Sequence, residues 1–209
     1  MHVLYITNIN KFFNMKLYNI LLLCLFFSVS YCQENIQEKK VNTEKSRLFW
    51  VGEKTGGSHE GYVNLLSGEI TLSNDNEERG WKIINGNFII DMKSIECIDL
   101  QGGSKKSIEG HLKDEDFFDI NNYPESKFEI TSDDGSSIEG NMTIKGITKP
   151  IKFDYKGYLN NDKLTIVANI IIDRTDFGIN YKSKSVFSEF ADNFIYDDFT
   201  ITLEPIIFE

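Results

Sequence analysis

Hydrophobic residues recur at every second position over most of the chain after residue 46. In residues 151–159 apolar, aromatic or glycine positions alternate with mostly charged ones, and residues 138–145 and 198–204 repeat the pattern. A period of two residues is typical of a β-strand that buries one face and exposes the other. Spacing of the helical kind is nearly absent. The pattern therefore predicts an all-β domain.

Turn-forming residues separate these runs and indicate how the strands connect. About eight strands are expected, and they include residues 47–52, 59–72 and 84–92. Asp134-Gly135 is a strong hairpin signal, and because most other connections are also short, strands that are neighbours in the sequence should pair. Eight antiparallel strands can close on themselves and either fill the interior or hold one ligand. We therefore predict an eight-stranded antiparallel up-and-down barrel.

Two connections are too long to be simple turns, residues 93–126 and residues 173–196. The first follows the third strand and contains residues 107–119, in which Ile108 and Leu112 lie one helical turn apart. We predict a short helix there. Long loops in a compact barrel are usually functional. This one could plug an end of the barrel or act as a lid, since its two adjacent phenylalanines give it an apolar side.

The first 32 residues have the pattern of an export signal. Lys16 precedes a continuous apolar stretch, residues 20–27, which is too short to span a bilayer. Ser30 and Cys32 are small residues of the kind that a signal peptidase requires, so cleavage is expected after Cys32. Met15 could be the true start of this signal.

This interpretation divides the chain into a signal peptide over residues 1–32, a flexible lead over residues 33–45 and a barrel domain over residues 46–209. The lead is polar and aperiodic, which is typical of a flexible connection. A lipoprotein alternative would acylate Cys32 and hold the protein on a membrane. That site normally needs a small residue where this chain has Tyr31, which favours simple cleavage and a periplasmic or secreted protein.

The charge balance limits the classes of partner. The chain has 22 basic and 32 acidic residues, a formal net charge of −10, and loss of the predicted signal makes it −12 because two lysines leave with it. An acidic protein of this size is repelled by phosphate backbones and anionic lipid surfaces, so no nucleic-acid partner is expected. No apolar run is long enough for a transmembrane helix, so no transmembrane segment is expected.

Residues able to carry catalysis or to bind a metal are few. After the predicted signal the chain has two histidines, His59 and His111, one cysteine, Cys97, and no G-x-S-x-G motif. These residues are not closely spaced, so no zinc site is predicted, and a single thiol allows no internal disulfide. We expect no catalytic residue, no metal and no cofactor. An enzyme that acts on a lipid, with His59 and a nearby acid inside the barrel, stays open as an alternative.

Several short motifs, taken together and in order, are similar to one known family. They are His59-Glu60-Gly61, residues 88–95 (FIIDMKSI), His111-Leu112 before residues 116–119 (DFFD), residues 141–149 (NMTIKGITK) and residues 173–179 (DRTDFGI). Each motif alone is weak, but the series covers residues 46–208. Over this span the chain resembles the YceI-like family, the lipocalin-like polyisoprenoid-binding domain of exported bacterial proteins.

The resemblance implies an extended, lipocalin-like barrel whose long apolar tunnel takes a lipid tail, in an exported binding protein without established catalysis. Relatives are reported to bind isoprenoid quinones or prenyl phosphates, and others bind fatty-acid amides. We therefore expect an isoprenoid, quinone-like or fatty-acyl lipid as the partner, for transport, storage or an envelope stress response. A filled barrel that serves as an interaction module stays open, as does a homodimer.

Side chains on the predicted inward faces would line either a filled core or a tunnel, and the resemblance favours the tunnel. The predicted lining is Trp50, Val63, Leu65, Phe88, Ile90, Met92, Phe128, Ile130, Met142, Phe153, Tyr155, Ile170, Ile172, Phe177 and Ile201. Four inward positions on different strands are glycines: Gly61, Gly86, Gly140 and Gly157. These glycines either let the strands coil sharply or leave room for a ligand.

Two residues are candidates for contact with a polar head group. His59 shares its parity with apolar inward positions, and its imidazole could donate a hydrogen bond to a ligand or serve only the structure. Arg174 follows an apolar strand directly. Its guanidinium could grip a phosphate or carboxylate at the tunnel mouth, or it could pair with Asp173 or Asp176 and fasten the loop.

Overall fold

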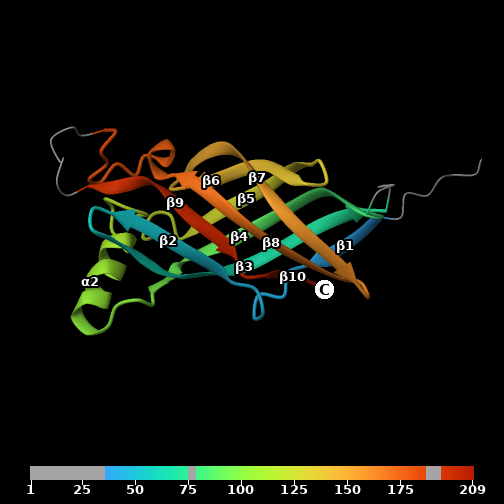
Figure 1. The fold of residues 1–209 in the computed structure, drawn as a ribbon, viewed down its shortest axis with the longest axis horizontal. Coiled ribbons are helices and arrows are strands. Elements are labelled where there is room, and N and C mark those ends of the chain that lie inside the picture. Colours follow the sequence, from blue (N-terminus) through green and yellow to red (C-terminus); the bar gives the residue numbers. More distant parts are fainter. Residues whose placement is uncertain (1–35, 75–78, 187–193) are drawn as a thin grey trace, which may run out of the picture. The chain divides into compact units, whose positions relative to one another are not determined.

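Figure 1 shows the fold of the computed structural model, which describes residues 36–74, 79–186 and 194–209. The predicted signal peptide, residues 1–32, lies outside the described residues. The strands are β1 (Ile36–Lys40), β2 (Leu48–Lys54), β3 (Gly57–Ser73), β4 (Lys82–Cys97), β5 (Glu125–Asp133), β6 (Ser137–Ile144), β7 (Ile147–Asn160), β8 (Lys163–Asp173), β9 (Ile195–Leu203) and β10 (Ile206–Phe208). The described helices are α2 (Gly102–Lys113) and the short 3-10 helix η1 (Arg174–Phe177).

Eight of these strands close into the predicted barrel. From β2 to β9 each strand pairs antiparallel with the next one in the sequence. Strand β9 then returns to β2, with Ile201 opposite Trp50, and this pairing closes the sheet on itself. The alternating apolar side chains therefore face one shared interior. The prediction of an all-β, eight-stranded antiparallel up-and-down barrel is confirmed.

Successive connections of an antiparallel meander lie at alternate ends of the barrel. One end, here called the helix end, carries α2, η1 and the turns at residues 55–56 and 145–146. The other, here called the turn end, carries the hairpin turns at residues 134–136 and 161–162. Figure 1 shows α2 at one extreme of the barrel and the β7–β8 hairpin at the other.

Two short strands extend the barrel beyond the reach of β2 and β9. Strand β1 pairs with the second half of β3, and β10 pairs with the first half of β8. A bridge between Val41 and Phe208 joins these two strands, and Lys40 and Glu209 exchange backbone hydrogen bonds of 3.1 and 2.9 Å. The prediction of a flexible lead over residues 33–45 is therefore wrong for residues 36–40. Their order comes from backbone hydrogen bonds to β3, which a polar sequence does not reveal.

The predicted helix is present in the connection after the third barrel strand, but it lies earlier than residues 107–119. Helix α2 begins at Gly102 and ends at Lys113. After it the chain forms turns in which the Phe118 N–H donates to the Leu112 carbonyl at 3.1 Å. These turns place Phe117 and Phe118 against the helix end of the barrel, where both rings are buried. The two phenylalanines thus supply the apolar side expected of this segment.

Neighbouring groups fill the space beside the inward glycines. A Cβ atom at Gly61 would overlap the Glu96 carbonyl oxygen, and one at Gly140 would overlap the Glu129 carbonyl oxygen. Likewise, a Cβ at Gly86 or Gly157 would come within 2.8 Å of a neighbouring side chain. The glycines therefore permit close packing of strands and side chains, and the alternative that they leave room for a ligand is not supported.

Candidate functional site

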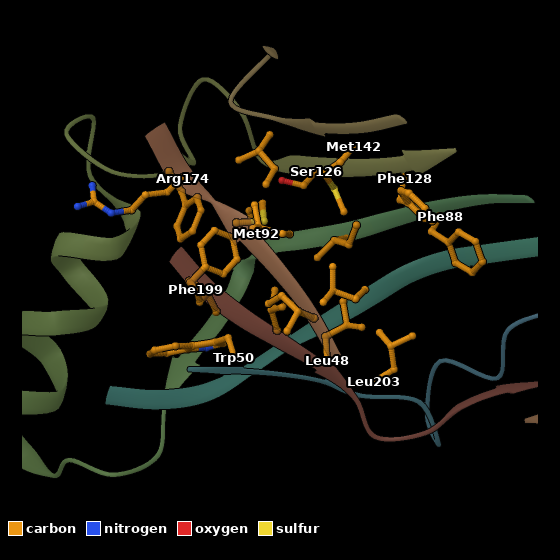
Figure 2. A pocket seen from close by; sticks show the side chains of 18 of the residues that line it. Leu48, Trp50, Phe88, Met92, Ser126, Phe128, Met142, Arg174, Phe199 and Leu203 are labelled. Carbon is orange, nitrogen blue, oxygen red and sulfur yellow. The ribbon is translucent and has the colours of Figure 1, made fainter. Parts of the chain in front are cut away.

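The barrel encloses an elongated apolar cavity of about 170 Å³ (Figure 2). All eight barrel strands contribute to its lining, together with Leu112 of α2, the Phe117–Phe118 pair and two residues of β10. Thirteen of the fifteen residues predicted to line a tunnel do line this cavity: Trp50, Val63, Leu65, Phe88, Ile90, Met92, Phe128, Ile130, Met142, Phe153, Ile170, Ile172 and Ile201. Their role in binding a ligand stays a prediction.

The two other predicted residues are buried but lie outside the cavity lining. Phe177 belongs to η1 and is 1% exposed. Tyr155 lies on β7 beyond Phe153, and its hydroxyl donates to Asp133 at 2.8 Å instead of facing the cavity. Strict alternation placed Tyr155 on the inner face correctly, but it could not show where along the barrel the cavity stops.

The cavity stops near a buried polar cluster at the turn end. Asp133 forms an ion pair with Arg79 and accepts hydrogen bonds from the Ile83 N–H at 2.9 Å and from the Tyr155 hydroxyl. The Arg79 guanidinium stacks 3.8 Å from the centroid of the Trp81 ring. Burial, followed by the hydrogen bond to Asp133, raises the pKa of Tyr155, so the phenol stays a donor. This cluster closes the turn end with side chains from the barrel itself.

Polar residues line the cavity mainly at the helix end. Arg174, Tyr196 and Asp198 all contribute to the lining there, whereas Ser126 is the polar side chain nearer the middle. Figure 2 shows the Arg174 guanidinium pointing away from the cluster of apolar side chains. The surface of the cavity is nonetheless almost entirely apolar, which suits the apolar tail of a ligand.

Arg174 fastens the segments that cover this mouth. Its guanidinium donates to the carbonyl oxygens of Ile179 at 2.7 Å, Ile195 at 3.0 Å and Tyr196 at 3.1 Å, and it lies 3.4 Å from the Asp197 carboxylate. Burial lowers the pKa of Arg174, while the charge of Asp197 acts in the opposite direction. All three guanidinium nitrogens thus serve the protein.

The loop-fastening role proposed for Arg174 is therefore present, but the expected partners were wrong. Asp173 instead accepts hydrogen bonds from the N–H and hydroxyl of Thr175, and Asp176 lies 3.9 Å from Lys149. Among the described residues neither acid forms an ion pair with the guanidinium, although the charge of Asp173 still acts on the pKa of Arg174. Sequence proximity favoured them, whereas the true partner lies on β9.

His59 also lies outside the cavity lining. Its Nδ1 atom is 2.8 Å from Asp99, which also accepts hydrogen bonds from the Glu60 N–H at 3.1 Å and from the Cys97 thiol at 3.0 Å. Burial acts to raise the pKa of Asp99, but these hydrogen bonds outweigh it and hold the pKa well below its usual range. Burial, and then Asp99, raise the pKa of Cys97. The sequence spacing of these residues gave no sign of this cluster.

His111 lies among aromatic side chains. Its ring lies 4.2 Å from the Tyr181 ring and 5.5 Å from the Phe117 ring, measured between centroids. The Nε2 atom is buried without a hydrogen-bond partner among the described residues. Burial lowers the pKa of His111, which keeps the ring neutral among its aromatic neighbours.

Comparison with known proteins agrees with this barrel and its cavity. The sequence matches the YceI-like domain over residues 40–205. The chain belongs to the YceI-like family. Its YceI-like domain is 29% identical over 118 residues to a UPF0312 protein of Pseudomonas putida, a match that covers 47% of this chain and 62% of that protein. A UPF0312 protein of Staphylococcus aureus is 31% identical over 80 residues, 35% of this chain and 47% of that protein. The chain thus matches less than two thirds of the length of these curated relatives.

Two solved structures share the fold of this YceI-like domain. BcnA of Burkholderia cenocepacia superposes with a TM-score of 0.58 at 17% identity, over 80% of this chain and 98% of that one. A polyisoprenoid binding domain from Saccharophagus degradans also gives a TM-score of 0.58, at 12% identity, over 82% of this chain and 97% of that one. In the part of the chain that is described, no helix has the length and apolarity needed to cross a bilayer.

Proposed function

We propose that this protein holds the apolar tail of an isoprenoid or similar amphipathic lipid in its barrel, without catalysis. The observation that carries the proposal is the elongated cavity, whose lining is almost entirely apolar and is drawn from every strand of the barrel. Each 100 Å² of tail surface removed from water would contribute about 2.5 kcal/mol. Apolar burial would therefore supply the affinity, and contacts at the mouth would orient the head group.

The cavity is too small for a long lipid tail unless its lining side chains move. A volume of about 170 Å³ is close to that of a cavity that holds benzene, about 150 Å³, whereas pockets for larger ligands have about 300–1,000 Å³. A long tail therefore requires lining side chains to change rotamer. The unbranched side chains of Met92 and Met142, both in the lining, suit such rearrangement.

We infer that the lipid enters at the helix end. Arg174, Tyr196 and Asp198 lie at this end, and Phe117, Phe118 and η1, which cover it, belong to connections between barrel strands. At the turn end the Arg79–Asp133 pair blocks the way and is tied to Ile83 at the start of β4. The name of the Saccharophagus degradans domain makes polyisoprenoids the first class of lipid to test.

We also propose that the protein is exported. The support for export is the N-terminal pattern of Lys16 followed by the apolar residues 20–27. Cell fractionation and N-terminal sequencing of the mature protein test it. A mature protein that begins at Gln33 supports cleavage and release, an acylated Cys32 supports the anchored alternative, and an uncleaved cytoplasmic protein contradicts export.

Organic extraction and native mass spectrometry of the purified protein test the binding function. We expect a lipid with a long apolar tail at about one molecule per chain, and Met142→Trp should lower that occupancy several-fold because the indole fills the cavity. Lys156→Trp is the matched control, because Lys156 is an exposed outward residue on the neighbouring strand β7. Both variants should keep a wild-type circular dichroism spectrum.

Three results would contradict the proposal. Equal lipid occupancy in folded Met142→Trp and Lys156→Trp would show that the lipid lies elsewhere. Failure to bind either co-purified or added polyprenyl lipid would favour the filled interaction module. Chemical conversion of the bound lipid by the purified protein would favour the enzyme alternative, which the positions of His59 and Asp99 outside the cavity lining do not support.

A further inference from the structure

The pairing of β3 with β4 brings His59 beside two other metal-binding side chains, Cys97 and Asp99, which lie about 40 residues later in the sequence. Cys97, the last residue of β4, lies opposite Gly61. The Ile98 N–H donates to the Glu60 carbonyl at 2.9 Å, and the Glu60 N–H donates to the Asp99 carboxylate at 3.1 Å. His59 thereby comes to lie beside Asp99. Gly61 is essential to this approach, because a Cβ there would overlap the Glu96 carbonyl.

The donor atoms of His59, Cys97 and Asp99 form a compact group. One nitrogen, one sulfur and one oxygen lie within 4.8 Å of one another, with 2.8 Å from His59 Nδ1 to Asp99 Oδ2 and 3.0 Å from Cys97 Sγ to Asp99 Oδ1. Cys97 is 0% exposed, whereas the side chains of His59 and Asp99 are 19% and 26% exposed. The group is thus buried on the sulfur side and open on the imidazole and carboxylate side.

We propose that His59, Cys97 and Asp99 form a binding site for a divalent transition-metal ion of the zinc class. Imidazole, thiolate and carboxylate are zinc ligands, and tetrahedral bonding places such donors about 3.3–3.6 Å apart. The imidazole and the thiol lie 2.8 and 3.0 Å from different oxygens of Asp99, and one donor atom of each residue lies within 4.8 Å of the others, so side-chain rotation has to bring the donors to that spacing. The thiolate and carboxylate balance the charge of a dication, and the open side leaves a fourth position for water or an external ligand.

Neighbouring groups would hold two of these ligands in place. The Glu60 N–H fixes the Asp99 carboxylate, and Glu109 of α2 accepts the Cys97 N–H at 2.9 Å. Glu109 in turn lies 3.5 Å from Lys105 on the next turn of the helix. Outer contacts of this kind orient metal ligands and contribute to affinity. None of the three ligands lines the apolar cavity, so the metal site is independent of lipid binding.

Titration of the full, metal-free, reduced chain with Co²⁺ tests the proposal. Cobalt replaces zinc in such sites and gives a thiolate-to-metal charge-transfer absorption together with tetrahedral ligand-field bands. We expect one Co²⁺ per chain with both signals, and displacement of cobalt by Zn²⁺. Cys97→Ser should remove the charge-transfer band, and His59→Gln and Asp99→Asn should each weaken Co²⁺ binding about tenfold or more.

His111→Gln is the matched control, because His111 packs on Tyr181 and Phe117 away from the cluster; its titration should equal that of the wild type. His59 is partly exposed, so His59→Gln should fold even if a change at buried Cys97 does not. Absence of a charge-transfer band in the wild type, or an unchanged titration in folded His59→Gln, would overturn the proposal. Binding that is lost in both His59→Gln and Cys97→Ser would support it.

Discussion

The two ends of the barrel each carry an arginine–carboxylate pair, but the pairs join different parts of the structure. At the turn end, Arg79 and Asp133 link the segment just before Trp81 to the end of β5, and Asp133 also binds the backbone of β4. At the helix end, Arg174 of η1 binds the carbonyl oxygens of Ile195 and Tyr196 and pairs with Asp197, all at the start of β9. One pair joins the β3–β4 connection to the end of β5, and the other joins η1 to the start of β9.

We propose that this difference decides which end of the barrel opens. Separation of Arg79 from Asp133 would leave a carboxylate whose side chain is 0% exposed without its cation, and it would remove the hydrogen bond that Arg79 donates to the Tyr155 hydroxyl. Movement of Phe117 and Phe118 at the helix end would break ring contacts but no strand pairing. Local opening favours regions held by few buried hydrogen bonds. The mutations below test this contrast.

The largest effect should come from Asp133→Ala at the turn end. The substitution leaves the Arg79 guanidinium, the Ile83 N–H and the Tyr155 hydroxyl without a shared acceptor, and loss of one partner of a buried pair costs about 3–5 kcal/mol. Urea unfolding at neutral pH measures the free energy of unfolding. A loss below about 1 kcal/mol would show that the turn end does not depend on this pair.

A matched pair of variants, Phe118→Leu and Tyr155→Phe, distinguishes a loss of stability from a faster release of lipid. Each should cost about 1–2 kcal/mol of stability, one through lost packing and the other through a lost buried hydrogen bond. Only Phe118→Leu, at the helix end, should accelerate release of a fluorescent lipid. If the substitution removes about 1.4 kcal/mol of packing against the lining, the release rate should rise about tenfold. Faster release from Tyr155→Phe alone would place the entrance at the turn end.

The barrel could be predicted from the sequence because hydrophobic residues recur at every second position within each barrel strand. Met142 and Phe153 were predicted to face inward because the residues next to them in the sequence are polar, and both line the cavity. Tyr155 shows the limit of that pattern, since parity gives the face but not the depth at which the Arg79–Asp133 pair ends the cavity. Strand β1 was missed because backbone pairing with β3, and not apolar side chains, orders it.

The polar contacts could not be predicted from spacing. Local acids appeared to be the natural partners of Arg174, yet its ion pair is with Asp197 on a different element. In the same way His59 meets Asp99, which lies 40 residues away, only because β3 and β4 pair in one register. Contacts between strands depend on that register, which a one-residue slip would change completely.

A smaller and pH-dependent effect should follow from Asp197→Asn at the helix end. Burial acts to raise the pKa of Asp197, but hydrogen bonds from Ser183 and Ser185 and the charge of Arg174 hold it below its ordinary value of 3.8. A lowered pKa in the folded state means that the carboxylate stabilises the fold above pH 3.8, and that this contribution is lost as the pH falls through the folded pKa. We expect Asp197→Asn to cost about 1 kcal/mol at neutral pH.

Urea unfolding from pH 7 down to pH 3 measures this contribution. The difference between wild type and Asp197→Asn should shrink as the pH falls, because the wild type loses the charge that the variant already lacks. Amide hydrogen exchange should be faster in η1 and the start of β9 of the variant, with β5 and β6 unchanged. If the difference in unfolding free energy does not change with pH, the loss of stability comes from the altered hydrogen bonding or packing of the side chain and not from its charge.

The smallest effect should come from Asp134→Asn in the β5–β6 hairpin of the turn end. The Asp134 carboxylate accepts hydrogen bonds from the hydroxyl of Ser137 and from the N–H and hydroxyl of Ser136, and these lower its pKa. The sign is therefore the same as for Asp197, with stabilisation present above the ordinary pKa and lost in acid. Asparagine keeps one acceptor oxygen, and the turn is exposed, so urea unfolding should show a smaller loss than for Asp197→Asn at every pH. A loss larger than that of Asp133→Ala would mean that the exposed hairpin, and not the buried Asp133 beside it, holds the turn end closed.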